Sequence, residues 1–235
     1  MLKYHFDWGV VLSGRYLDWL LSGVQVTISL SGLAIVLALV LGLMVAMLRL
    51  SPWRPLRYLA HAYLEFFRNT PLLVQIFFWY FGSYKILPQA LNDWLAATDF
   101  EFAAGVLALG LYTSAFIAED IRSGVRSIPK EQMEAARSAG FGFLGAMRHV
   151  ILPQAVRVTI PPLINQFLNL VKNSSLAMTI GVAELTYQAR QVESYSFKGL
   201  EAFSAAALIY LLLSLAIAGG MNLYNRRVLM PAGGR

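Results

Sequence analysis

Five polar side chains recur at helical spacing in one otherwise apolar stretch of the sequence. They are Asn165, Gln166, Asn169, Lys172 and Asn173. Two consecutive prolines, Pro161 and Pro162, precede them and remove backbone donors from a helix, which leaves carbonyl groups without partners. Polar side chains in a membrane helix usually face the bundle interior or a water-filled cavity. The pattern therefore fits the wall of a translocation path, and it also fits hydrogen bonding between packed helices.

Gln75 and Tyr80, in a second apolar stretch, are further candidates for lining a translocation path.

Catalytic patterns are missing from the sequence. No Gly-rich phosphate loop ending in Gly-Lys-Ser/Thr occurs, and the three histidines do not form a His-Glu-x-x-His zinc pattern. There is no cysteine, which excludes disulfides and thiolate sites, and no pair of carboxylates lies in the middle of an apolar stretch. A membrane-embedded enzyme therefore has no catalytic constellation, and no metal or cofactor is expected in this chain.

The segment 122–153 reads as a polar loop that carries short helices. Ser127, followed by a proline and acids, favours a helix start, and Gly140 can end that helix in the left-handed conformation. A second short helix is expected over about 143–150 and should stop at Pro153. The small residues of the first helix would let it lie in a groove of another protein, although a plain connector has the same composition.

The elements that position these residues must lie in a membrane. The chain has 235 residues, of which 57% are hydrophobic and 14% charged, and its mean hydropathy is +0.57. Soluble domains have about 45–50% apolar and about 25% charged residues. A charge at the bilayer centre costs about 2.5–3.5 kcal/mol, so charge-free stretches indicate spans. The longest such stretches predict five spans, over residues 19–48, 69–84, 102–118, 158–171 and 202–225.

The distribution of charge predicts the orientation of these spans. In one orientation the inner side carries 13 basic residues and five acidic ones, against six basic and eight acidic residues outside. The positive-inside rule therefore places the N-terminus outside and the C-terminus inside. Because this topology accounts for the net charge of +6, a nucleic-acid partner is not expected.

Two further patterns concern the ends of the spans. Residues 1–19 lack the form of a cleavable signal, and Trp8, Leu12, Tyr16 and Trp19 share a helical face, which predicts an interfacial segment at the outer membrane surface. Small residues at four-residue spacing predict helix packing in the first and last spans. These residues are Ala34, Ala38, Gly42 and Ala46, and then Ala202, Ala206, Ser214 and Ala218.

Several motifs resemble those of ABC importer permeases. The segment 134–153 reads Glu-Ala-Ala, three residues, Gly, nine residues and then Val-Ile-Leu-Pro, which resembles the coupling-loop motif of that family; Val150 stands where isoleucine is commoner. The chain is more specifically similar to polar-amino-acid permeases over about residues 20–225. The matching segments are 67–75 (Phe-Arg-Asn-Thr-Pro-Leu-Leu-Val-Gln), 127–129 (Ser-Ile-Pro), 152–155 (Leu-Pro-Gln-Ala) and 172–176 (Lys-Asn-Ser-Ser-Leu).

The resemblance implies an all-α, five-span, MetI-like transmembrane domain over 20–225, with a cytoplasmic coupling loop at 122–153 and a cytoplasmic tail at 226–235. It implies a bacterial inner-membrane assembly with a second permease subunit of the same or a paralogous chain, two cytoplasmic ATPases and an extracytoplasmic solute-binding protein. ATP and Mg would be bound by the ATPases, and this chain would hold no cofactor. The residues implied for ATPase coupling are Glu134, Ala135, Ala136, Gly140, Leu152 and Pro153.

The function expected from this resemblance is ATP-driven import of polar amino acids. The motifs look most like those of glutamate/aspartate permeases. Lys172 could attract a substrate carboxylate, but a lysine there also occurs in relatives that move basic amino acids, which favours a structural role for it. A channel or secondary transporter that needs no ATPase is the alternative, and it would leave the coupling motif without a use. Co-purification with an ATPase separates the two hypotheses.

Overall fold

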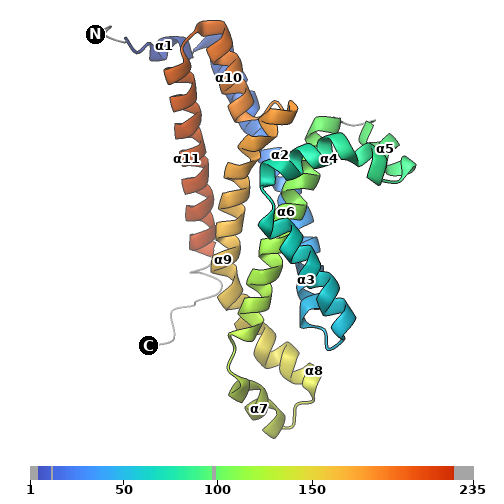
Figure 1. Cartoon of the computed structure of the whole chain (residues 1–235). Helices are drawn as coiled ribbons and strands as arrows, with labels where there is room; N and C mark the ends of the chain where they lie inside the picture. The colour runs from blue at the N-terminus through green and yellow to red at the C-terminus, as the bar shows by residue number, and fades with distance from the viewer. Residues whose placement is uncertain (1–4, 12, 97–98, 225–235) are drawn as a thin grey trace. The chain divides into compact units, whose positions relative to one another are not determined.

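A computed structural model describes residues 5–11, 13–96 and 99–224, and this part of the chain is helical with no strand (Figure 1). Regular structure runs in the order α1 (Trp8–Val11), α2 (Gly14–Leu50), α3 (Arg54–Asn69), α4 (Leu72–Ile86), α5 (Gln89–Ala96), α6 (Phe100–Arg126), α7 (Lys130–Ser138), α8 (Phe143–Ala146), the π-helix η1 (Met147–Ile151), α9 (Leu152–Asn173), the 3-10 helix η2 (Ser174–Ile180), α10 (Leu185–Ser196) and α11 (Gly199–Tyr224). The expected all-α architecture is confirmed.

Three of the described helices are long and apolar enough to cross a membrane. They are α2, α6 and, over Gly199–Met221, α11. The first two contain the first and third predicted spans, and α11 covers most of the fifth. The second predicted span coincides mainly with α4, which has 15 residues, and the fourth lies within α9, which has 22 residues. A helix of 15 residues rises about 22 Å, which is less than the roughly 30 Å hydrocarbon core.

The chain divides into two compact units, each built from three segments. The first unit comprises Met1–Ile35, Pro71–Gly110 and Leu168–Ile217. The second comprises Val36–Thr70, Leu111–Phe167 and Ala218–Arg235. The boundaries fall inside α2, α6, α9 and α11, so each of these helices contributes residues to both units.

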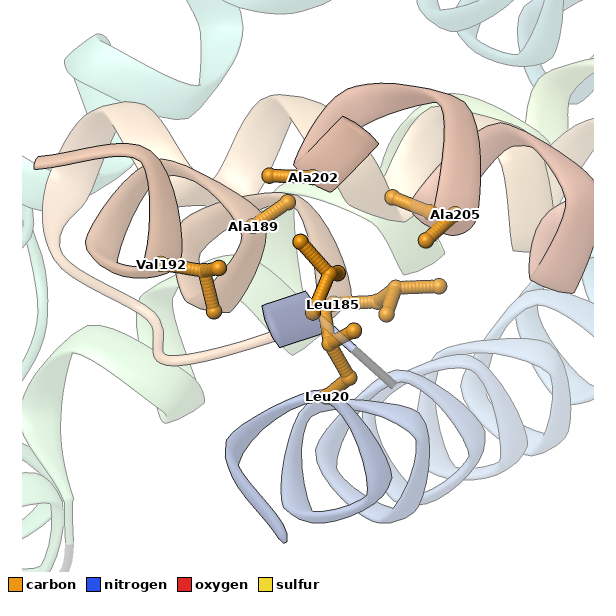
Figure 2. Packing of buried hydrophobic residues seen from close by; sticks show 8 residues of the cluster. Leu20, Leu185, Ala189, Val192, Ala202 and Ala205 are labelled. Atoms are coloured by element: carbon orange, nitrogen blue, oxygen red, sulfur yellow. The ribbon is translucent and has the colours of Figure 1, made fainter. Parts of the chain in front are cut away.

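The first unit has an apolar core of leucine, valine and alanine at one end of its helices. Leu20 from α2 points toward Leu185 of α10, and alanines of α11 close the cluster (Figure 2). Ala202 and Ala206, both predicted as packing residues, are buried here. Because alanine has no side chain beyond Cβ, the backbones approach closely, and this close approach stabilises helix pairs in lipid.

The second unit packs through small residues of α2. Ala38, Gly42 and Ala46 are all buried, as their four-residue spacing predicted. A hydrogen bond from the Tyr63 hydroxyl to the backbone oxygen of Leu111, at 3.1 Å, attaches α3 to α6. The small-residue stripe is therefore architecture in this unit, because it allows helices to approach.

The N-terminal segment differs from the single helical face that was expected. The helix α1 ends at Val11 and α2 begins at Gly14, so Tyr16 and Trp19 belong to the long apolar helix rather than to a separate one. Val11 is fully buried against the core of the first unit, which ties α1 to that core. Leu12 and the tail at 226–235 lie outside the described residues, and the interfacial position of residues 1–19 stays a prediction.

The loop 122–153 confirms one expectation and corrects another. The helix α7 forms where it was predicted, and Gly140 follows it with φ +90°, in the left-handed region. The predicted stop at Pro153 is wrong, because the chain stays helical from Phe143 through η1 into α9. The π turn bonds the amide of Leu152 to the carbonyl of Met147, and this shift of register relieves the usual clash of a proline ring with the preceding turn.

Candidate functional site

A cavity of about 620 Å³ lies in the first unit and has a mixed polar and apolar wall. Lys172 at the end of α9 supplies its one charged side chain among the lining residues. The lining residues are Lys172, Ser175, Thr186, Phe203, Ala206, Ala207, Tyr210, Leu211 and Ser214. A largely apolar cavity with a few convergent polar groups is the usual form of a small-molecule site.

A buried hydrogen-bond network supports the polar wall of this cavity. Glu184 is fully buried, caps the start of α10 by accepting the amide of Tyr187 at 2.8 Å, and accepts the hydroxyl of Tyr210 on its other carboxyl oxygen. The hydroxyls of Thr186 and Tyr210 lie 3.2 Å apart. Because a glutamate satisfies an unpaired N–H at a helix start, the same side chain orders α10 and orients Tyr210.

The position of the network follows from local structure at the α10 start. Glu184 has an extended backbone and stands directly before the first helical residue, Leu185, which is where a capping side chain is required. The amide of Leu185 is bonded to Thr27 Oγ1 at 3.1 Å, so α2 satisfies a second unpaired donor of this helix end. The network therefore joins α2, α10 and α11 around one helix terminus.

The predicted polar residues of α9 have different surroundings. Asn165, Asn169 and Lys172 are exposed, whereas Gln166 and Asn173 are half-buried. Of these side chains, Lys172 lines the cavity of the first unit. It has no ion-pair partner among the described residues, which argues against a structural salt bridge as its role.

Among the predicted polar residues of α9, Gln166 is the one that bonds to a side chain of another helix in the described part of the chain. Its amide nitrogen donates to Oδ2 of Asp120 in α6 at 2.8 Å, within the second unit. The interpretation of the polar residues as hydrogen bonds between helices therefore applies to this position. Asn165 and Asn169 make no side-chain hydrogen bond in the described residues, so that interpretation does not extend to them within one chain.

The two candidates in α4 lie elsewhere in the first unit. Gln75 is 3% exposed, and Tyr80 packs its ring against Phe100 with ring centres 5.6 Å apart. Neither residue lines the cavity around Lys172. Their assignment to a translocation path stays a prediction.

The residues behind the cavity wall were not predicted from the sequence. These residues are Thr186, Tyr210 and Glu184. The available signal was a lone acid between two apolar stretches, in the run Gly-Val-Ala-Glu-Leu-Thr at 181–186. An acid in such a place is expensive to bury unless it is paired, which is a reason to search for its partner.

The coupling-loop residues divide by exposure. Glu134, Ala135, Gly140, Leu152 and Pro153 are exposed, but Ala136 is only 6% exposed. It belongs to α7, which contacts η1 and α8 (Figure 1). Ala136 therefore packs inside the loop, and a partner protein would meet Ala135 instead.

Two large apolar side chains of the loop are exposed and were not predicted as contacts. Phe143 is 64% exposed and Leu144 is 80% exposed, both in α8. The sequence signal for them was an apolar pair in an otherwise polar loop. Exposed apolar residues of this size add to the surface that a partner could cover.

Comparisons with known proteins agree with this architecture. Residues 38–230 match the family described as binding-protein-dependent transport system inner membrane component. The chain is 45% identical over 208 residues to the probable glutamine ABC transporter permease protein GlnM of Bacillus subtilis, covering 88% of this chain and 92% of that protein. It is 38% identical over 241 residues to the glutamate/aspartate import permease protein GltJ of Escherichia coli K12, covering 98% of each.

A solved structure of an amino acid ABC transporter with histidines is similar over nearly the whole fold. The TM-score is 0.84 at 33% identity, and the match covers 96% of this chain and 100% of that one. A MetNI methionine ABC transporter matches with a TM-score of 0.73 at 20% identity, which supports the fold alone. The helical architecture agrees with the family match over residues 38–230 and with the similarity to amino-acid permeases. The chain therefore belongs to the MetI-like family of binding-protein-dependent inner-membrane permeases, as the transmembrane subunit of an amino-acid ABC importer whose ATP is hydrolysed by a separate subunit.

Proposed function

We propose that this permease subunit imports acidic amino acids, glutamate and aspartate, through a path that includes the cavity around Lys172. The observation that carries the proposal is the ammonium group of Lys172, which has no ion-pair partner in the described part of the chain and lies in a cavity wall without a carboxylate among its lining residues. A lysine ammonium group and a carboxylate form charge-assisted hydrogen bonds, which are stronger than those between neutral groups. The similarity to a glutamate/aspartate import permease over 98% of both chains supports the same substrates.

Glutamine is the second candidate, because the relative that is 45% identical is a probable glutamine permease. Glutamine also carries a carboxylate that Lys172 could attract, so the lysine alone does not separate the two substrates. The side-chain carboxylate of glutamate and aspartate is the distinguishing group.

The proposed assembly contains a second permease subunit, two cytoplasmic ATPases and an extracytoplasmic solute-binding protein. The N-terminus would lie outside and the C-terminus inside, with the loop 122–153 against the ATPases. Hydrolysis would then move the loop, and the movement would open the polar path to either side in turn. The excess of basic residues on the proposed inner side supports this orientation.

The test is uptake by the complete assembly in proteoliposomes that contain ATP. Radiolabelled glutamate, aspartate and glutamine are supplied separately, each with the cognate binding protein. We expect uptake of glutamate and aspartate, and a tenfold excess of unlabelled glutamine should compete weakly. Uptake of glutamine alone would transfer the assignment to the second candidate. Uptake that continues without ATP hydrolysis would contradict the ATP-driven mechanism.

A further inference from the structure

We propose that the cavity around Lys172 binds the zwitterionic head of an amino acid in one orientation, with a carboxylate toward Lys172 and the ammonium group toward Tyr210 and Thr186. This inference rests on the proposed function, because it takes the transported molecule to be an amino acid. It assigns each charged group of the amino acid to one side of the cavity. Glu184 is then a positioning residue that does not touch the substrate.

The direction of each hydrogen bond in the network carries the inference. Both carboxyl oxygens of Glu184 accept a hydrogen bond, one from the amide of Tyr187 and one from the hydroxyl of Tyr210. A phenol has a single proton, so the hydroxyl of Tyr210 has none left to donate. Its oxygen can therefore only accept a further hydrogen bond.

The neighbouring hydroxyls are restricted in the same way. Thr186 Oγ1 lies 3.2 Å from the Tyr210 oxygen. Because Tyr210 donates its proton to Glu184, a hydrogen bond between these two hydroxyls uses the proton of Thr186. Ser175 donates to the backbone oxygen of Lys172 at 2.7 Å. These three hydroxyl groups of the cavity wall thus present acceptor lone pairs to a ligand. The fourth hydroxyl of the wall, on Ser214, has no hydrogen bond among the described residues and can also donate.

Three acceptor hydroxyls on one side and the ammonium group of Lys172 on the other match a ligand that carries both an ammonium group and a carboxylate. An ammonium group has three donors and no acceptor, which matches the oxygens of Tyr210 and Thr186. A carboxylate has only acceptors and matches the ammonium of Lys172. The remaining wall, which includes Phe203, Ala207 and Leu211, is apolar and suits the methylene groups of an amino acid.

Two substitutions alter the wall without a large change in shape. Tyr210→Phe removes the acceptor oxygen. In Glu184→Gln, the amide oxygen can still accept from Tyr187, and the NH2 group then faces the hydroxyl of Tyr210 as a donor. Tyr210 must accept from it, so its own proton turns toward the cavity. Both variants should weaken the recognition of an ammonium group.

The experiment measures protection of a single cysteine in the purified permease–ATPase complex, without a binding protein. The chain has no cysteine, so Ala207→Cys in the cavity wall supplies the only permease thiol for a water-soluble maleimide. The probes are L-glutamate and L-glutamine, each beside its N-acetyl derivative, which lacks the ammonium group. We expect about a tenfold higher concentration of the acetylated probe to be needed for half-protection, since a hydrogen bond to a charged group is worth about that factor or more.

In the Tyr210→Phe and Glu184→Gln backgrounds, this ratio should fall to about twofold or less. In the Lys172→Met background, both members of a pair should protect more weakly, while their ratio is kept, because both members retain the carboxylates. Matched controls are Tyr58→Phe, an exposed tyrosine in the second unit, and Glu193→Gln, an acid on α10 outside the network. These controls should leave the ratio unchanged.

Three results would overturn the inference: equal protection by free and acetylated probes in the unaltered wall, no protection by any probe, or an unchanged ratio in Tyr210→Phe. The first two results are measured on Ala207→Cys alone. They therefore test the proposed ligand orientation even if Tyr210→Phe or Glu184→Gln fails to assemble. If the complete assembly still imports amino acids, the proposed function survives such a result. If the complete assembly imports no amino acid, the proposed function fails whatever the maleimide labelling of Ala207→Cys shows.

Discussion

The side-chain amide of Gln166 donates a hydrogen bond to Asp120, 46 residues earlier in the chain, at 2.8 Å. The bond joins α9 to α6 inside the second unit. Asn165, the residue just before Gln166, is exposed and makes no such bond in the described residues. Two adjacent polar residues of one helix therefore have different roles. Gln166 is a packing residue, and Asn165 presents a polar group outward.

Removal of the Gln166 amide should destabilise the protein. Gln166→Leu leaves the half-buried carboxyl of Asp120 without its donor, and loss of one partner costs about 1–3 kcal/mol. We expect a lower unfolding temperature in detergent, measured by thermal denaturation. Asn165→Leu is the matched control and should unfold at the temperature of the unaltered protein. Equal unfolding temperatures for both variants would show that the bond to Asp120 contributes no stability.

Cysteines at Asn165 and Asn169 should react with a water-soluble thiol reagent if the exposed amides of α9 line the translocation path. The reaction rate should change when the ATPases bind or hydrolyse nucleotide, since alternating access changes which side of the path is open to water. The measurement is labelling of single-cysteine variants in the cysteine-free chain, followed by mass spectrometry. Absence of labelling in every nucleotide state would assign these residues to a contact between subunits or with lipid.

A large residue at Ala135 should uncouple ATP hydrolysis from transport. The Ala135 side chain is exposed on α7, so Ala135→Trp adds bulk only on the surface that a partner would meet. Ala136 is buried in the loop, and Ala136→Trp should disturb the packing of α7 against η1 itself. The expected result is normal assembly with loss of transport-linked ATPase activity for Ala135→Trp, and poor assembly for Ala136→Trp. Normal coupled activity in Ala135→Trp would remove this face of α7 from the interface.

Gly124→Ala should disturb the contact between α6 and α9 in the second unit. A Cβ added at Gly124 would lie 1.9 Å from Thr159 Oγ1 and 3.2 Å from Thr159 Cβ. Overpacking of this kind typically costs about 1–3 kcal/mol. We expect a lower yield of folded protein in size-exclusion chromatography, and Thr159→Ala in the same chain should restore part of it.

Gly32→Ala is the matched control for this substitution. Gly32 also lies inside a long helix, and a Cβ there would meet nothing within 4 Å. Because alanine has a higher helix propensity than glycine, this variant should fold at least as well as the unaltered protein. A reduced yield for Gly32→Ala would mean that the size-exclusion measurement is reporting something other than overpacking.

The sequence by itself determined the features that depend on local composition. Apolar stretches predicted the long helices, because a backbone in lipid must satisfy its own hydrogen bonds. Pro129 and Gly140 predicted where α7 begins and ends, because helix ends depend only on residues close in the chain. The predicted role of Ser127 at the start of α7 is wrong, because its hydroxyl donates to the backbone oxygen of Gly124 at the end of α6 instead. The coupling motif predicted the family, which the comparisons confirm.

Tertiary structure decided the features that depend on residues far apart in the chain. Helical periodicity could not show that Ala136 faces inward, because α7 is short and its packing partner comes later in the loop. Continuation of the helix through Pro153 depends on the π turn before it, a change of register that no residue type announces. The link between Glu184 and Tyr210 spans 26 residues and two helices, and it exists only because α10 and α11 fold back on each other. Hydrogen-bond direction in the cavity wall follows from that link, since a single proton on Tyr210 can be shared with only one acceptor.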